Sequence, residues 1–384
     1  MPYYNVTSLT YEVNGRTIVV PTITGEPIAI GETSWYSNGN TNSFPKPTSI
    51  PSGILYYVPV TITNSQSSAT PSPFQQMIQI NEGNYANYIA YNGNIANFEF
   101  YTQSGSILPA WIESNNSGTL TVWVNLPNGI PASSSLTIYL GFASTSTSLL
   151  SNSGTSGIGE APQLSCPNPD SPANCPTYAE YDDGSSVFNN YWNFAGTSLP
   201  SGWSSSASGS GSIHVNNGVI LDPKAKANPG NAYAISNTYI TSTTLVDEYI
   251  TSQYTNNGQD MCLVSSASST SFSYEADSVG FQNEELSQYS NDLLIENNPS
   301  GTPSVIARTP VNVPLIVSVY NNTLYVNYNK VASISGQILA NGYLTLEENT
   351  GTSASFTVQW LRTRAYPPNG VMPTVTFGSV QQTS

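Results

Sequence analysis

Charged side chains are scarce in this chain of 384 residues, because only 8% are Asp, Glu, Lys or Arg. An average globular protein carries roughly 25%. The 23 acidic residues outnumber the 8 basic ones and give a formal net charge of −15. Nucleic acids and anionic membrane surfaces bind clustered Lys and Arg, and the cations here form only two short pairs. We therefore expect no nucleic-acid partner. No membrane insertion is expected either, since no apolar run approaches the roughly 18 residues of a spanning helix.

The shortage of carboxylates also predicts tolerance of acid. Acid denaturation acts mainly on carboxylates that are paired in the folded state, and this chain has few to protonate. The composition therefore favours an acidic or otherwise harsh external environment, with ordinary secreted-protein composition as the alternative explanation.

Histidine is almost absent, which narrows the catalytic possibilities. A Ser-His-Asp hydrolase would have to use His214, and the sequence contains no G-x-S-x-G nucleophile motif. His214 precedes an Asn-Asn-Gly turn in an expected strand, so we interpret it as a structural or exposed residue.

Cysteine occurs three times, and two of the residues lie close together in CPNPDSPANC. The eight intervening residues are rich in Pro, Asn and Asp and can fold back. We therefore predict a disulfide between Cys166 and Cys175, as is typical of an external protein. A zinc site would need two more ligands. The third cysteine, Cys262, lies in the apolar stretch MCLV and is expected to be a buried thiol.

Helical periodicity is missing, whereas alternation with a period of two recurs throughout the chain. YYVPVTITN, TLTVWVNL and SLTIYLGF read as half-buried strands, and PLIVSVYNNTLYVNYN reads as a hairpin that turns at Asn321 and Asn322. SFTVQWLR is expected to place Phe356, Val358, Trp360 and Arg362 on one face. Short strands separated by Gly, Asn and Pro turns predict an all-β protein of tandem β-sandwich or jelly-roll domains.

Four regions follow from changes in composition along the chain. Residues 1–48 form a short N-terminal β segment for anchoring or assembly, and residues 49–150 form a first β-sandwich. Residues 151–185 are a Ser/Gly/Pro-rich connector that carries the expected disulfide loop. Residues 186–384 form a second, larger β-sandwich.

Several motifs resemble a domain of unknown function that is common in archaeal surface and secreted proteins. The matching stretches are VPVTITNSQ, FEFYTQSGSILPAWIES and LTVWVNLPNGIPASSSLTIYLGF. In that family a concanavalin A-like, laminin-G-type sandwich often follows, and YDDGSSVFNNYWNFAGTSLPSGW resembles its beginning. The resemblance covers roughly residues 50–380 and implies a surface-exposed, adhesive or structural protein, sometimes sugar-binding. It implies no catalytic residues.

Glycoside hydrolysis is the enzymatic alternative, because concanavalin A-like sandwiches host such enzymes. A retaining enzyme needs two carboxylates roughly 5–5.5 Å apart. EADSVG supplies Glu275 and Asp277, but the second Glu of the laminarinase-like pattern is absent at Val279 or Gly280. We therefore expect no enzymatic activity.

Candidate ligand-binding residues are few and weakly specified. We expect no cofactor, with calcium at Asp182 and Asp183 as the alternative to a simple Asp-Asp-Gly turn. Asn5, Asn115 and Asn321 begin N-x-Ser/Thr sequences and are candidate glycosylation sites. Several tyrosines in or near expected loops are candidates for stacking on sugars, although tyrosine in β proteins is more often half-buried: Tyr85, Tyr88, Tyr91, Tyr101, Tyr289 and Tyr366.

The opening MPYYNVTSLTYEVNG lacks the basic and apolar segments of a secretory signal. A virion protein is assembled inside its host and needs no such signal. We therefore expect a non-enzymatic spike, turret or fibre component of an archaeal virus that projects from the particle and contacts the host. Residues 1–48 would self-associate or dock onto other structural subunits, and the sandwiches would meet a glycan or another host-surface receptor. The alternatives are an archaeal cell-surface adhesin or a filament or envelope protein with glycan binding, followed by a glycoside hydrolase.

Overall fold

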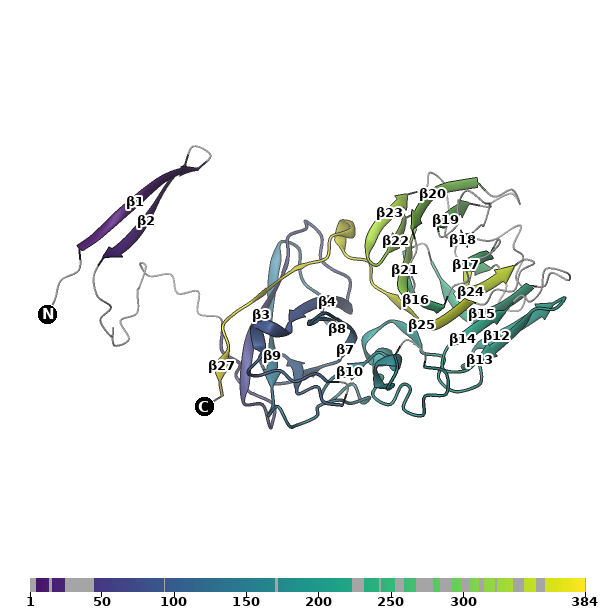
Figure 1. Cartoon of the computed structure of the whole chain (residues 1–384), viewed down its shortest axis with the longest axis horizontal. Coiled ribbons are helices and arrows are strands. Elements are labelled where there is room, and N and C mark those ends of the chain that lie inside the picture. The colour runs from purple at the N-terminus through teal and green to yellow at the C-terminus, as the bar shows by residue number, and fades with distance from the viewer. Residues whose placement is uncertain are drawn as a thin grey trace. The chain divides into compact units, whose positions relative to one another are not determined.

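The computed structural model describes residues 5–13, 16–24, 45–92, 94–169, 172–222, 231–241, 243–252, 259–266, 279–283, 292–297, 304–310, 314–321, 323–333, 342–349 and 356–383. The chain divides into two compact units, Met1–Phe44 and Pro45–Ser384. Strands make up nearly all of the regular structure, which confirms the expected all-β class (Figure 1). In the part of the chain that the structure describes, no helix has the length and apolar character needed to cross a bilayer.

The N-terminal unit contains one antiparallel pair of strands, β1 (Asn5–Val13) and β2 (Arg16–Thr24). Val13 pairs with Arg16, so the connection between the strands is two residues long. The sequence has Asn-Gly at those two positions, a pair that short hairpin connections favour.

The first sandwich consists of two sheets, and the apolar positions expected in β3 lie between them. In β3, Val58, Val60 and Ile62 are fully buried and pack in the core between the sheets. One sheet has the order β26-β3-β9-β5-β6, and the other has the order β10-β7-β8-β4. Their bounds are β3 (Tyr56–Asn64), β4 (Phe74–Asn81), β5 (Phe98–Tyr101), β6 (Ile107–Leu108), β7 (Ala110–Asn116), β8 (Thr119–Leu126), β9 (Ser134–Phe142), β10 (Gly159–Glu160) and β26 (Thr374–Phe377).

Several strands of this sandwich are buried on both faces and are not half-buried as expected, and β8 is the example that bears on the site. Residues Leu120 to Val124 of β8 are all buried, on both faces of the strand. Leu120, Val122 and Val124 pack in the first sandwich, whereas Trp123 packs with residues of the second sandwich. Alternation in the sequence could not show this second contact, because Thr and Trp do not themselves indicate what covers them.

The second sandwich contains two larger sheets. One has the order β13-β14-β25-β16-β21-β22-β23, with β11 paired to β25, and the other has the order β12-β15-β24-β17-β18-β19-β20. The bounds of the first sheet are β11 (Asn190–Trp192), β13 (Ser212–Val215), β14 (Val219–Asp222), β16 (Leu245–Ser252), β21 (Leu315–Tyr320), β22 (Thr323–Val326), β23 (Asn329–Ser333) and β25 (Phe356–Arg364). Those of the second are β12 (Trp203–Ser208), β15 (Asn231–Ile240), β17 (Gln259–Ser266), β18 (Val279–Asn283), β19 (Asp292–Asn297), β20 (Ser304–Pro310) and β24 (Gly342–Asn349).

The expected hairpin at residues 315–328 is present as the antiparallel pair β21–β22. Leu315, Val317 and Val319 enter the core, and Leu324 returns to it. Helical structure among the described residues is limited to single turns, namely η1 (Glu82–Tyr85), η2 (Pro162–Ser165), α1 (Gly184–Val187) and η3 (Pro368–Gly370).

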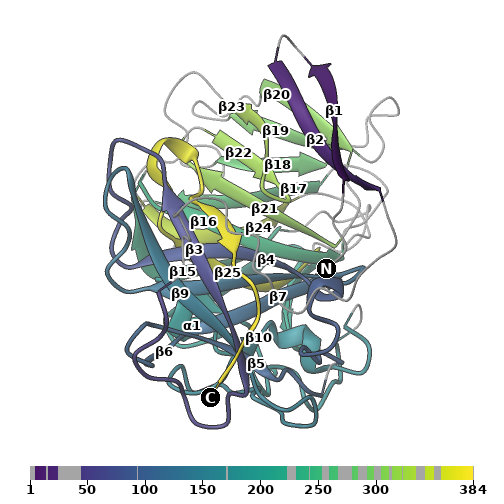
Figure 2. The same ribbon diagram turned by 90° about the vertical axis from the view of Figure 1, so that its left-hand side faces the viewer.

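The last strands of the chain belong to the first sandwich, although the predicted limits assigned residues 186–384 to the second. After β25 the chain crosses to the first sandwich, where β26 and β27 (Gln381–Gln382) pair antiparallel with β3 (Figure 2). Met372, Val375, Phe377 and Val380 pack against the first core. The chain thus leaves the first sandwich, forms the second, and returns to cover the edge of β3.

We predict that the returning strand stabilises the first sandwich. Phe377→Ala should lower the free energy of unfolding by about 2 kcal/mol, because a half-buried ring that packs against Tyr85 is lost. Thr376→Ala, whose side chain is exposed on the same strand, should change it by less than about 0.5 kcal/mol. Urea unfolding of both variants measures the difference, and equal effects would contradict the packing assignment.

Candidate functional site

The two sandwiches meet at a buried arginine. Arg362 of β25 is fully buried, and its Nη2 donates to Glu113 Oε2 of the first sandwich at 2.8 Å. Its Nε donates to Asp247 Oδ2 of β16, also at 2.8 Å. Arg364 Nε donates to the same Asp247 oxygen at 2.7 Å. We call this group of Glu113, Asp247, Arg362 and Arg364 the arginine junction.

A break in the alternation of β25 aims Arg362 at the junction. Tyr249 of β16 pairs with Trp360, and the next residue, Ile250, pairs with Val358, so Gln359 is an extra residue in β25. Such a bulge changes the face that the following side chains occupy. Val358 accordingly packs in the core of the second sandwich, whereas Trp360 packs at the junction. The prediction that Phe356, Val358, Trp360 and Arg362 share one face was therefore wrong.

Aromatic rings enclose the Arg362 guanidinium. Its Cζ lies 4.3 to 5.4 Å from the ring centroids of four side chains, which come from both sandwiches: Trp111, Trp123, Phe188 and Trp360. At these distances the negative faces of the rings attract the cation. The rings also exclude water, which strengthens the ion pairs but makes any unpaired charge costly.

Further hydrogen bonds satisfy the carboxylates of the junction. Glu113 Oε2 accepts from Trp123 Nε1 at 2.8 Å and from the Tyr328 hydroxyl. Burial alone would raise the pKa of Asp247, but Arg364 and Arg362 beside it bring that pKa below its ordinary value. The two guanidinium cations and the two carboxylate anions of the junction therefore compensate one another inside the protein.

A pocket of about 150 Å³ lies beside the junction. We call it the junction pocket. Both sandwiches contribute to its walls, which combine aromatic, aliphatic and polar side chains and include Met77, Trp123, Tyr325, Tyr328, Arg364 and Tyr366. The Tyr325 and Tyr366 hydroxyls are 3.2 Å apart, and the Tyr366 ring stacks on Tyr320 with centroids 3.4 Å apart. This arrangement offers ring faces, hydroxyl groups and one cation to a small ligand.

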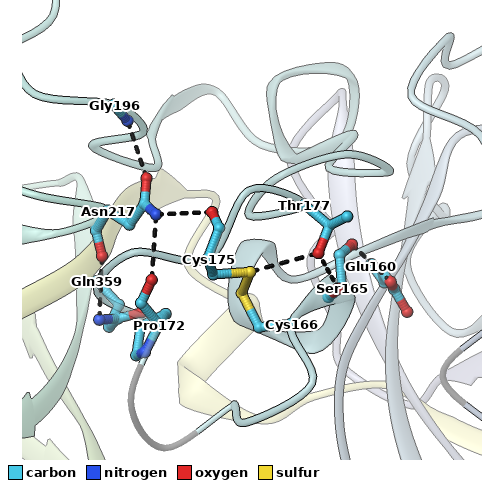
Figure 3. Close-up of a disulfide and its surroundings, with 9 residues drawn as sticks. All are labelled: Glu160, Ser165, Cys166, Pro172, Cys175, Thr177, Gly196, Asn217 and Gln359. Atoms are coloured by element: carbon cyan, nitrogen blue, oxygen red, sulfur yellow. Dashed lines mark hydrogen bonds between the residues drawn. A yellow bond between two sulfur atoms is a disulfide. The ribbon is translucent and has the colours of Figure 1, made fainter.

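The disulfide loop of the connector is attached to the second sandwich. Cys166 and Cys175 form a disulfide, with Cα atoms 5.8 Å apart. Asn217 Nδ2, between β13 and β14, donates to Pro172 O at 3.1 Å and to Cys175 O at 3.0 Å (Figure 3). Gln359 Nε2 donates to Asn217 O at 3.2 Å, so the loop is linked to the bulge in β25.

The candidate calcium ligand Asp182 serves as a hydrogen-bond acceptor within the protein. Its Oδ1 accepts from Trp111 Nε1 at 2.8 Å and from Gly184 N at 3.0 Å. Its Oδ2 accepts from Tyr191 OH at 2.9 Å and from Asn193 Nδ2 at 2.7 Å. Burial raises the pKa of Asp182, and these donors oppose the rise. Four donors occupy its carboxylate, which therefore holds the connector against the junction.

Asp183, the second calcium candidate, is also buried, and burial raises its pKa to about 6. Within the described ranges, no group of three or more His, Cys, Asp and Glu side chains is arranged to hold a metal ion. Calcium binding stays a prediction that nothing in the structure tests.

The other predicted residues lie apart from the junction pocket or outside the described side chains. His214 is exposed on β13, and its Nε2 lies 3.1 Å from Ser212 Oγ. Asn115 and Asn321 are exposed, in keeping with their role as candidate glycosylation sites. Tyr85, Tyr88 and Tyr91 pack against the first core. Glu275, Asp277 and Tyr289 lie outside the described residues, as do the side chains of Asn5 and Cys262.

Sequence reasoning missed Glu113 and Asp247, which complete the arginine junction. A carboxylate inside an otherwise apolar strand was the available signal, as in AWIES and LVDEYI. A buried charge of this kind normally requires a partner. The sequence, however, did not indicate which of the eight cations would provide it.

Part of the first sandwich matches a described protein family. Residues 94–158, which include β5 to β9, match the model of a domain of unknown function, DUF2341. The chain is also 38% identical over 138 residues to Uncharacterized protein 562 of Sulfolobus islandicus rod-shaped virus 1. That match covers 35% of this chain and 21% of the viral protein, so the aligned region spans about a fifth of the relative's length.

Solved structures resemble part of the chain in fold. The Emp46p carbohydrate recognition domain in its metal-free form has a TM-score of 0.33 at 10% identity, over 43% of this chain and 88% of its own. LamAcat from Zobellia galactanivorans has a TM-score of 0.36 at 11% identity, over 46% and 97%. The endo-β-1,3-glucanase from Pyrococcus furiosus has a TM-score of 0.36 at 7% identity, over 47% and 94%. Scores and identities this low carry no inference about activity.

We predict that the junction depends on its charge balance. Arg362→Met should lower the free energy of unfolding by about 3–5 kcal/mol, because Glu113 and Asp247 lose their shared partner while they stay buried. The triple variant Arg362→Met, Glu113→Gln and Asp247→Asn should recover part of this loss. Denaturant unfolding measures both. A loss below about 1 kcal/mol in the single variant would show that the ion pairs add little.

We also predict that the protein is more stable in mild acid than at alkaline pH. Burial raises the pKa of Glu248 from 4.5 to about 8 and that of Glu160 to about 7. Such groups bind a proton more tightly when folded, so the free energy of unfolding should fall as pH rises from 4.5 to 8. Asp247 acts in the opposite sense, because its pKa is lowered when folded and its contribution is lost below its ordinary value of 3.8.

Urea unfolding across this pH range tests the dependence. Glu248 is 1% exposed, and its Oε1 has no hydrogen-bond partner among the described residues. It pairs with the apolar residues Val317 and Leu361 in the neighbouring strands. Glu248→Gln should therefore reduce the slope between pH 4.5 and 8. An unchanged slope in that variant would assign the dependence to other groups.

Proposed function

We propose that this chain is a non-enzymatic structural or adhesive protein on the surface of an archaeal virus particle. The stretch of 138 residues that is 38% identical to a protein of Sulfolobus islandicus rod-shaped virus 1 carries the proposal. The disulfide is compatible with an external location, where such bonds persist. A surface protein of an archaeal cell is the alternative location.

The arginine junction supports a mechanical role. The two sandwiches share buried ion pairs, an aromatic cluster and a strand that returns from one to the other. Interfaces between domains of one chain are usually more polar than the interfaces of permanent complexes, and they allow the domains to move relative to each other. A joint that buries its charges among aromatic rings resists such motion, because opening it exposes or unpairs them. A stiff pair of sandwiches suits a projection that presents a binding surface away from its base.

The absence of enzymatic activity is part of the proposal. Asp182, Glu113 and Asp247 each accept hydrogen bonds that hold parts of the protein together, and this use supports a structural role for them. Glycan or receptor binding by the sandwiches, and self-association through residues 1–48, are the contacts we propose for such a protein.

Particle composition tests the proposal. Virus particles should be purified by density gradient from infected cultures, and the chain should be quantified by mass spectrometry in each fraction. We expect it to follow infectivity and to be labelled on the particle surface by antibodies in electron microscopy. Envelopes of uninfected cells are the control, and recovery of the chain from these envelopes alone would rule out the virion assignment.

A further inference from the structure

The junction pocket has the size of one six-membered ring. An apolar cavity of about 150 Å³ is known to bind benzene, and the volume of this pocket is also about 150 Å³. Gly370, which is exposed, contributes to its lining, so the pocket reaches the protein surface. Met77, Trp123 and Tyr328 provide apolar and aromatic walls against which the face of a ring can pack.

The charge around the pocket favours an anion. No carboxylate among the described residues lines the pocket, although the chain carries 23 acidic residues and a net charge of −15. Arg364 forms part of the wall, and its hydrogen bonds to Asp247 use Nε and Nη2, not Nη1. Burial raises the pKa of Tyr366 to about 12, and the nearby cations Lys330 and Arg364 oppose that rise.

Among the described residues, Lys330 is the cation near the pocket whose charge no ion pair offsets. Arg362 and Arg364 are balanced by Glu113 and Asp247, whereas Lys330 is exposed. A monoanionic ligand in the pocket therefore meets an attractive field, while most of this acidic protein repels it.

Hydroxyl groups provide the remaining polar contacts. The Tyr325 and Tyr366 hydroxyls, which contact each other, belong to half-buried residues in the pocket wall. Each can both donate and accept, which matches the hydroxyl groups of a sugar. Binding pockets commonly combine apolar and aromatic walls with a few polar groups of this kind.

We propose that the junction pocket binds one carboxylated pyranose residue, such as a uronic acid of an acidic glycan. The ring would pack between Met77, Trp123 and Tyr328, and its carboxylate would face Arg364 and Lys330. The inference rests on the adhesive part of the proposed function, and it names the class of sugar that is bound.

Ligand titrations with the purified full chain test the chemistry. Glucuronate, glucose and benzoate should be compared by saturation-transfer NMR and calorimetry. Glucose lacks the carboxylate, and benzoate lacks the hydroxyl groups. We expect saturable binding of glucuronate, with both comparison ligands at least about fivefold weaker, because each lacks one set of polar contacts. No saturable glucuronate binding overturns the proposal, and so does glucose or benzoate that binds as tightly.

Substitutions in and near the pocket test whether glucuronate binds there. Met372→Trp should fill the pocket and abolish binding, since Met372 is a half-buried residue of its lining. Lys330→Gln should weaken glucuronate binding about two- to fivefold, whereas Lys46→Gln removes an exposed lysine outside the lining and should leave it unchanged. Tyr366→Phe should weaken it about fivefold. If Lys330→Gln and Tyr366→Phe both bind glucuronate as tightly as the parent chain and unfold at the same temperature, this site is contradicted. That conclusion holds even if Met372→Trp misfolds. None of these results depends on whether the chain is found on virus particles.

Discussion

The charge of one buried guanidinium constrains how the two sandwiches meet. Arg362 is shielded from water by four aromatic rings, so its charge must be balanced within the protein. One of its carboxylate partners, Glu113, belongs to the first sandwich, and the other, Asp247, belongs to the second. Moving either sandwich away would leave a charge unpaired in a dry environment. The junction therefore specifies one relative arrangement of the two sheets that carry these residues.

Three other features hold the same arrangement by different means. Asp182 of the connector accepts from donors of both sandwiches, and thereby fixes the connector beside the aromatic cluster. The disulfide loop is hydrogen-bonded through Asn217 to the bulge that orients Arg362. The C-terminal strands return to β3 and complete the first sheet. The chain thus crosses between the sandwiches more than once. Separating the sandwiches would therefore disrupt the packing of elements that the chain connects on both sides.

The unusual composition has a structural meaning in this context. Two of only eight basic residues are placed inside the protein, where each pairs with a buried carboxylate. Other carboxylates, such as Glu248 and Glu160, are buried and have raised pKa values, so they stabilise the folded state more at acidic pH. This distribution agrees with the tolerance of low pH that the composition predicts.

The sequence by itself determined the elements that depend on neighbours along the chain. Alternating apolar residues predicted the strands and the 315–328 hairpin, and a separation of 9 residues made the Cys166–Cys175 disulfide accessible. Tertiary structure alone decided the arginine junction, because Arg362 is 249 positions from Glu113 and 115 from Asp247. It also decided the bulge at Gln359 and the return of the last strands to β3. Local periodicity reports which face of a strand is apolar, whereas long-range packing selects what covers that face and which distant charge compensates a buried one.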